Sequence, residues 1–522
     1  MTAPSHPESG SPDGSALPPP QCPAHAAGAA LNGVDRDLAP TTTAVSPVGP
    51  GGIRRLYGPE VTHDPVGVYE KLRAEHGSVA PVLLHEDVPA WLVLGHHEAM
   101  HVVTTPAVYS RDPRNWRLVH DGTVRPDHPL GPLFVWQPFC SFADGAEHVR
   151  QRGVVDEAMG AFRIRDARRY IDDFTNLLVN EFCRDGRADL VPQFTEHLPM
   201  MVMCEVLGMP EAYSERLVRA ARDMIKGTET ALASNEFVMQ HLMRLVAARR
   251  AQPTDDFTSR MLAHPSAFTD DEAAQHLRLV LIAAYETTAN LMANVILMVL
   301  TDPRFRAQLS GTSMTVVAAV EQTLWDRPPF TTMFGRWAAA DAELGGKRIA
   351  RGDALVLGIA AANLDPAIRP DRAKPMLGNR SYLTFSGGPH ECPGQDLGRT
   401  MVEIAVHSLL VRLPTVDLDA DEHELRYEAS LMAQHLKELP VTFEPGPPQA
   451  VSDGVTLTSL RPQETASGDL PRPAAAPPAA TPPADAPQAA GAPAPDPLIP
   501  AQRGVSAPRR LVRSVVRWWR GY

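Results

Sequence analysis

The sequence predicts a chain that is mainly α-helical with a minor β-region. A long apolar run opens at Thr269-Asp-Asp-Glu and continues to residue 301, which is typical of one central helix. Residues 166–250 carry several amphipathic helical patterns, broken near residues 208–210 and 227. Strand patterns are short and occur in few places, mainly at Val79–Leu84 and Ala90–Leu94 around a turn at residues 86–89.

The composition of the two ends separates them from a central globular part. Residues 1–52 are rich in Pro, Gly, Ala and Ser, and residues 447–505 are largely Pro and Ala. Such segments lack the apolar side chains that offset the entropy of ordering, so we expect a disordered N-terminal extension and a disordered linker. The folded domain is then expected at about 53–446. In the remaining segment, 506–522, Arg510, Arg513, Arg517 and Arg520 share one helical face.

This C-terminal segment is interpreted as basic and amphipathic, because Leu511, Val515, Trp518 and Trp519 lie towards its other face. Residues 509–520 could therefore dock on an anionic membrane surface or on an acidic protein partner. A solvated, unstructured end is the alternative.

Charge and cysteine usage narrow the class of protein. The formal net charge is −12 over 522 residues, which argues against nucleic acid as a partner. The five cysteines are an odd and scattered set without metal or disulfide spacing, so a reducing cytoplasm is expected. The N-terminus has no basic region followed by an apolar run, and thus no signal peptide is expected.

A loop rich in glycine and proline surrounds a single cysteine, Cys392. Gly388 and Gly394 lack a Cβ, so the backbone can turn sharply and approach a flat cofactor closely. Phe385 offers an apolar cover, and His390 is placed to reach an acidic group of such a cofactor. A helix is predicted from Gln395, and its positive dipole end would favour a thiolate. These features suit an axial haem ligand; a buried, inert cysteine is the alternative.

The same stretch carries a family resemblance. Its residues match all five fixed positions of Phe-x-x-Gly-x-His/Arg-x-Cys-x-Gly, and the stretch resembles the haem-binding loop of cytochromes P450. The resemblance implies the P450 fold, mainly α with a minor β-region, over about 53–446. It also implies haem b (iron protoporphyrin IX) as cofactor, with Cys392 as the iron ligand and Phe385, Gly388, His390 and Gly394 around it.

Three further basic residues fit this reading. Asp144 is a plausible N-cap with Glu147 three residues later, and His148 and Arg152 then share one helix face. In the family such a His-x-x-x-Arg pair binds a haem propionate. Arg336 matches the family's propionate-binding arginine in a later strand. His148, Arg152 and Arg336 are therefore predicted cofactor-binding residues.

The long helix carries the second motif. Its length equals a membrane span, but Glu286, Asn290 and Asn294 recur at four-residue spacing, which favours a core helix. Residues 283–287 match the family's oxygen-groove motif, although Ala284 replaces the usual Gly. By resemblance, Glu286 and Thr287 are the catalytic pair that delivers protons. A structural pairing of Glu286 is the alternative.

One motif departs from the family. The positions of its buried Glu-x-x-Arg pair hold Gln322 and Trp325 here, and Glu321 is no substitute because Leu324 stands three residues later. Gln and Trp can still hydrogen-bond, so a neutral network could replace the ion pair. The segment looks like a variant of an actinobacterial P450 subgroup with Gln-x-x-Trp at this place.

The resemblance implies a cytochrome P450 monooxygenase. It would oxidise a small apolar organic substrate with O₂ and with electrons from a ferredoxin and its reductase or from a flavoprotein. The alternative is a catalytically weak P450-like haem protein that acts as an interaction or sensor component of a GTPase/sensor-kinase-associated system. Peroxide-driven oxidation is a third option.

Overall fold

The computed structural model describes residues 46–125, 128, 130, 135–161, 164–209, 215–226, 230–306, 315–429 and 432–451. The expected N-terminal extension before residue 46, the expected linker after residue 451 and the whole basic segment 506–522 lie outside this part of the chain. The described ends of both tails contact the domain. The Arg55 N–H donates to the Pro47 carbonyl at 2.9 Å, and the Asn180 side chain donates to the Gln449 carbonyl at 2.8 Å.

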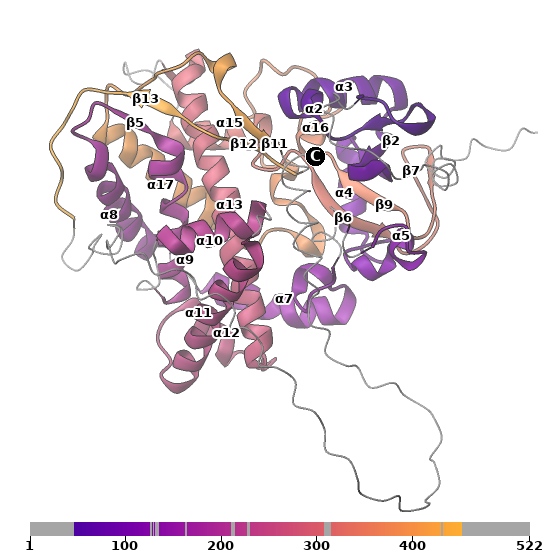
Figure 1. Cartoon of the computed structure of the whole chain (residues 1–522), viewed down its shortest axis with the longest axis horizontal. Helices are drawn as coiled ribbons and strands as arrows, with labels where there is room; N and C mark the ends of the chain where they lie inside the picture. The colour runs from indigo at the N-terminus through magenta and orange to yellow at the C-terminus, as the bar shows by residue number, and fades with distance from the viewer. Residues whose placement is uncertain are drawn as a thin grey trace, which may run out of the picture.

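Helices make up most of the described structure, as expected for a mainly α fold. Figure 1 shows the longer helices on the left of the view and the largest sheet, with several short helices, on the right. The helices are α2 (Pro59–His63), α3 (Pro65–His76), α4 (His96–Thr104), α5 (Arg117–His120), α7 (Gly145–Gly160), α8 (Ile164–Phe182), α9 (Leu198–Leu207), α10 (Glu215–Lys226), α11 (Ala231–Ala251), α12 (Phe257–Ala263), α13 (Asp270–Thr301), α14 (Pro303–Arg306), α15 (Val316–Asp326), α16 (Ile359–Asn363) and α17 (Gln395–Arg412).

The β-region consists of one six-stranded sheet with the order β1-β2-β3-β9-β6-β4 and of three smaller sheets. The predicted hairpin β2–β3 is antiparallel, and β9 joins β3 in parallel. The strands are β1 (Arg54–Arg55), β2 (Val79–Leu84), β3 (Val88–Val93), β4 (Tyr109–Ser110), β5 (Arg187–Asp189), β6 (Met333–Ala338), β7 (Ala342–Leu344), β8 (Lys347–Ile349), β9 (Ala354–Leu357), β10 (Asp417–Leu418), β11 (Tyr427–Ala429), β12 (Gln434–Leu436) and β13 (Pro440–Thr442).

The long helix α13 lies at the centre of the fold. Thr269 and Glu272 form the capping box that starts it, as the sequence predicts. By length and composition α13 could cross a membrane, but 61% of its apolar window is buried inside the protein. Every residue from Leu291 to Leu300 is buried. Because α9, α11, α15 and α17 pack around it, α13 is a core helix, as predicted.

Local signals set several boundaries correctly. Asp64 accepts the N–H of Gly67 and starts α3, and Gly77 ends it with a φ of 82°. The strand expected at residues 90–94 begins earlier, at Val88, because Glu86 and Asp87 take positive φ values and tighten the turn. The later strand expected to carry Arg336 is β6, which begins at Met333.

Candidate active site

The cysteine loop is held in a tight conformation between β9 and α17. Its backbone turns at Gly388, whose φ is 62° and where a Cβ would lie 2.5 Å from the Val103 carbonyl. The Cys392 N–H donates to the Phe385 carbonyl at 2.9 Å. The first contact explains why this loop requires glycine at residue 388. The second holds the cysteine side chain at a defined place.

Burial raises the pKa of the Cys392 thiol, and a hydrogen bond from the Gly394 N–H to the sulfur only partly opposes this. The Gly394 N–H thus acts in the direction expected of the helix start, but in the protein alone desolvation outweighs it. A thiolate at this position needs a cation such as a metal ion to stabilise it.

A cavity of about 320 Å³ separates this loop from α13. One wall is formed by the loop and the start of α17, including Phe385, Cys392 and Gly394. A Cβ at Gly394 would meet no atom within 4 Å, so the space beside the cysteine is open to a flat group. The facing wall is apolar and comes from α13 and from the segment before β6. It includes Leu279, Val280, Ala283, Thr287, Phe330 and Met333.

One edge of the cavity is built to receive an anion. Arg336 is 2% exposed, and its Nε and Nη1 atoms have no hydrogen-bond partner among the described residues. Burial, and next the neighbouring Arg111, hold the pKa of Arg336 well below its usual value. A buried guanidinium with unpaired donors requires a carboxylate or similar anion. Arg111 also lines the cavity and donates to the carbonyls of Gly335 and Ser141, at 2.6 and 3.1 Å.

Two histidines complete this edge. The rings of His148 and His390 lie with centroids 4.0 Å apart, and both residues line the cavity. Burial lowers the pKa of His390 to about 3 despite Asp144, whose carboxylate lies 3.4 Å from the ring. His148 Nε2 has no hydrogen-bond partner in the described part of the chain. Burial thus disfavours the charged form of both rings, and a neutral imidazole in either place can donate a hydrogen bond to an anion.

Asp144 does not cap α7 in the way that the sequence predicts. It occupies the N-cap position, but its side chain makes no capping bond. Instead it accepts from the Ser110 hydroxyl at 2.5 Å and from the Arg111 N–H at 3.0 Å. The Asp144 carboxylate thus binds residues distant in sequence in place of the helix start. It lies beside His390 and holds the loop that carries Arg111.

Arg152 lines the cavity, but its guanidinium group forms most of its hydrogen bonds with other residues of the protein. It donates to the carbonyls of Pro389 and Glu391, at 3.3 and 2.5 Å, and pairs with Asp156 at 2.5 Å. The predicted pair therefore divides its work: His148 faces the cavity, and Arg152 ties α7 to the cysteine loop.

The two predicted catalytic residues point in different directions. Thr287 lines the cavity, and its hydroxyl donates to the Ala283 carbonyl at 2.7 Å. Glu286 is absent from the cavity wall, because its carboxylate accepts from Nε2 of His435 at 2.9 Å. Asn290 and Asn294, on the same face of α13, donate to the carbonyls of Pro329 and Arg327, at 2.7 and 3.1 Å.

The altered motif on α15 forms hydrogen bonds, as predicted, but the network is not neutral because it includes the Asp326 carboxylate. Gln322 is fully buried; it accepts the Met376 N–H at 3.0 Å and donates to Asp326 at 2.7 Å. The Trp325 indole donates to the Asn379 carbonyl at 2.9 Å.

Charge is nevertheless retained beside this network, which the sequence reading did not foresee. Glu321 pairs with Arg380 at 3.1 Å and accepts the Gly378 N–H, while Asp326 pairs with the buried Arg369 at 2.5 Å. Glu321 therefore does help to hold the segment before the cysteine loop, with a partner 59 residues away.

Sequence reasoning missed three contributors to the site, namely Arg111, Asp144 as the partner of His390, and His435. Arg111 lies in a stretch without periodicity, and His435 lies just after Ala433 and Gln434, neither of which lines the cavity. Gln434 instead donates to the Thr62 carbonyl at 3.1 Å.

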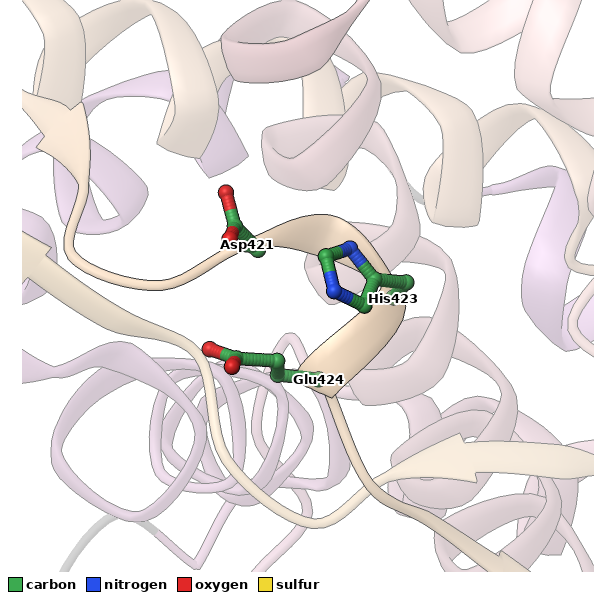
Figure 2. A group of neighbouring side chains, drawn as sticks. All are labelled: Asp421, His423 and Glu424. Carbon is green, nitrogen blue, oxygen red and sulfur yellow. The ribbon is translucent and has the colours of Figure 1, made fainter.

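Among the described residues, one group of acidic and histidine side chains is close enough to hold a metal ion. Asp421, His423 and Glu424 lie on a single turn, and all three are exposed (Figure 2). Exposed acidic side chains are common without an ion, so this turn is not assigned a metal.

Comparison with known proteins finds relatives over most of the domain. The mycinamicin IV hydroxylase/epoxidase of Micromonospora griseorubida is 30% identical over 365 residues, which cover 68% of this chain and 89% of that protein. Cytochrome P450 CYP107DY1 of Priestia megaterium is 29% identical over 406 residues, covering 74% and 97%. The structure of CYP154C4 from Streptomyces sp. W2061 has a TM-score of 0.67 at 29% identity, covering 74% and 97%. No protein-family model matches the chain.

These relatives agree with the cavity. Haem b, the cofactor of such proteins, is planar and carries two carboxylates. The residues present fit it, because the Cys392 thiol faces open space and Arg336, at the edge of the cavity, has two nitrogens without a partner among the described residues. The chain belongs to the cytochrome P450 superfamily of monooxygenases.

Proposed function

We propose that the chain oxidises a small apolar organic molecule with O₂ and with electrons from a separate ferredoxin or flavoprotein. In this proposal Cys392 ligates the haem iron, and Phe385 and Gly394 border the macrocycle, with Gly388 shaping the loop. His148, Arg152, Arg336 and His390 form the basic edge that meets the propionates, and Arg111 is added to them from its position at the same edge. A cytoplasmic location, expected from the cysteine usage, belongs to the same proposal.

The observation that carries the proposal is the unpaired Arg336. Two of its nitrogens are buried without a hydrogen-bond partner in the described residues, in the same cavity that exposes Cys392. An uncompensated buried cation typically costs several kcal/mol, so an anionic cofactor that fills the cavity would remove a large penalty. A buried, inert cysteine would need no such edge.

When bound, haem supplies the redox-active iron that activates O₂. The protein's part is to exclude water and to supply protons. The Thr287 hydroxyl faces the cavity while its own hydrogen is directed to the Ala283 carbonyl, which leaves lone pairs on Oγ1 to accept a hydrogen bond. Glu286 stands one residue behind it and would provide the proton.

The substrate class follows from the wall opposite the cysteine. The residues of α13 and of the β6 approach that line it are apolar apart from the threonines, and the charged groups gather at the propionate edge. Such a wall rewards burial of an apolar molecule and offers no counter-ion to a charged one. Relatives with names such as 6-deoxyerythronolide B hydroxylase and vitamin D(3) 25-hydroxylase support an organic substrate of this kind.

The departure at Gln322 and Trp325 motivated the alternative of a weakly active sensor. Other contacts, however, hold this part of the protein in place of the missing ion pair. Glu321 pairs with Arg380, and Asp326 pairs with Arg369. No contact in the described residues favours the sensor reading over turnover. Docking through residues 509–520 lies outside the described residues.

The test is the absorption spectrum of the reduced, carbon-monoxide-bound protein, in the wild type and in two serine variants. Cys392→Ser should abolish the thiolate-type Soret band. Cys140→Ser is the matched control, because Cys140 is a second buried thiol that lines the same cavity, and it should keep the band. A wild-type spectrum of the histidine-ligated type would contradict the proposal.

Turnover is tested separately. Oxygen consumption with a surrogate ferredoxin system should rise when an apolar ligand that shifts the haem spectrum is added, and oxidised product should form. Spectral binding without any coupled product, over a broad set of such ligands, would instead favour the sensor alternative.

A further inference from the structure

The carboxylate proposed to deliver protons is held from behind by a histidine that comes from a distant hairpin. We propose that His435 is a positioning residue for proton delivery: it orients Glu286 and returns protons to it from the solvent side. This inference rests on the proposed function. It adds to that function a route by which the protons consumed in each turnover reach the helix.

The contact is short and lies away from the cavity. Nε2 of His435 donates to Oε1 of Glu286 at 2.9 Å, and the two side chains are 21% and 13% exposed. Because Glu286 does not line the cavity whereas its neighbour Thr287 does, the carboxylate stands between the imidazole and the active site. Of the two paired groups the imidazole has the greater access to water, so it is the natural entry point for a proton.

The hairpin that carries His435 is anchored on both sides of the site. In the two-stranded sheet of β11 and β12, β12 packs against α13 and β11 packs against α2, near the middle of the molecule (Figure 1). The Met432 carbonyl accepts the N–H of Thr331 at 2.8 Å, in the segment that leads to β6. Gln434 is fastened to the Thr62 carbonyl. Because alternate residues of a strand face opposite ways, these anchors direct His435 towards the helix while Gln434 is held elsewhere.

A second carboxylate extends the arrangement. In the antiparallel register Glu428 lies directly opposite His435, so the two side chains share one face of the hairpin. Glu428 is half-buried, so its carboxylate is in partial contact with water. His435 is thus bonded to a carboxylate on α13 and lies opposite a second carboxylate on β11, which is a second group able to supply the ring with a proton.

The proton step is balanced at each atom. The Nε2–H bond of His435 breaks as an O–H bond forms on Glu286. The ring takes up a proton at Nδ1 from water or from Glu428 in the same step, which leaves it protonated at Nδ1 alone. It returns to its starting tautomer when Nδ1–H gives its proton to water and Nε2 takes one up from water. The electrons come from the donor protein and not from this relay. Imidazole suits the task because its two nitrogens can take and give protons at the same time.

The inference is tested with three variants in the full-length, haem-loaded protein. His435→Ala removes the relay. His435→Gln keeps an N–H donor for Glu286 but cannot pass a proton through a ring. Gln434→Ala is the matched control, because it loosens the same strand without touching Glu286. The measurements are kcat, KM, peroxide released per O₂ consumed, and the solvent deuterium isotope effect.

We expect His435→Ala and His435→Gln to lower kcat at least about tenfold, which is less than the roughly 100-fold or more that a group in direct proton transfer contributes, because His435 acts through Glu286. KM should not change, since His435 does not line the cavity. Peroxide release and the solvent isotope effect should rise, and added imidazole should partly rescue the alanine variant alone. Gln434→Ala should resemble the wild type.

A wild-type rate and coupling in His435→Ala would overturn the inference, as would full activity of His435→Gln, which would make the contact merely structural. An equal loss in Gln434→Ala would assign the effect to the hairpin and overturn it too.

A readout independent of turnover tests the contact itself. In ¹⁵N-histidine-labelled protein, the Nε2–H signal that disappears in His435→Ala should move in Glu286→Gln; an unmoved signal would refute the pairing. Failure of the proposed function looks different, since the wild type itself would then lack the thiolate-type spectrum.

Discussion

Restoring the family's glutamate at residue 322 should destabilise this protein. The Gln322 amide is fully buried and donates to Asp326 Oδ2 at 2.7 Å. Gln322→Glu replaces that donor with an oxygen, so a hydrogen bond worth about 1 kcal/mol is lost and two carboxylates face each other. Two like charges about 4 Å apart repel by about 4 kcal/mol at an effective dielectric constant of 20.

Two features of the site reduce this repulsion. Arg369 pairs with the other oxygen of Asp326 at 2.5 Å, and the Asp326 side chain is 23% exposed, so water screens it. We therefore expect a net loss of about 2–3 kcal/mol, a large share of the roughly 5–15 kcal/mol that stabilises a typical protein.

The assay is urea unfolding followed by far-ultraviolet circular dichroism. Gln322→Met is the matched control, because it removes both hydrogen bonds without adding a charge and should cost about 1–2 kcal/mol. The loss in Gln322→Glu should exceed that of the control and should shrink as the pH falls and the new carboxyl group takes up a proton. A glutamate variant as stable as the wild type would refute the reasoning, since it would mean that the bond from the Gln322 amide to Asp326 does not help to hold this helix.

Three further predictions concern the cavity. Arg336→Met should raise the melting temperature of the haem-free protein, because it removes an unpaired buried cation, and should weaken haem binding about tenfold or more, measured by haem transfer to apomyoglobin; unchanged haem affinity would contradict it. Gly388→Ala should lower the free energy of unfolding in urea by about 1–3 kcal/mol, because φ is 62° at this residue. Gly394→Ala should change the stability of the haem-free protein by less than about 0.5 kcal/mol but should reduce haem uptake. Equal stabilities of the two variants would contradict this prediction. Burial raises the pKa of Asp144, but interactions with His390 and other donors outweigh burial and lower this pKa below its ordinary value of 3.8. The contribution of Asp144 to stability is therefore complete above about pH 3.8 and is lost as the pH falls through the lowered pKa. Asp144→Asn should make acid unfolding, measured by circular dichroism, less steep, and an unchanged acid transition would refute this.

Much of the fold was accessible from local signals. The capping box at Thr269, the cap at Asp64 and the glycine after α3 lie within a few residues of the boundaries that they set. Hydrophobic period predicted α13 as a core helix, since a stripe of polar residues is compatible with a protein interior that supplies partners. The strand boundary at Val88 was missed, because it depends on positive φ values at Glu86 and Asp87 that their residue types do not signal.

The site divides along the same line. Gly388 follows from sequence, because a backbone turn of positive φ demands a residue without a Cβ. The direction of Glu286 does not follow, because its partner comes from a hairpin 149 residues further on. Asp144 has the sequence context of a helix cap, but its carboxylate instead accepts hydrogen bonds from the Ser110 hydroxyl and the Arg111 N–H, which come from another segment.

The sequence alone therefore determined the elements, the cysteine loop and the family to which the chain belongs, because these depend on residue types at short and regular spacing. The tertiary structure decided which charges meet. It placed Arg336 beside Arg111 with two of its nitrogens lacking a partner among the described residues. It also paired Glu321 with Arg380 and set His435 behind Glu286. The physical reason is that hydrogen bonds and ion pairs act over a few ångströms in space, and separation along the chain says nothing about that distance until the core has folded.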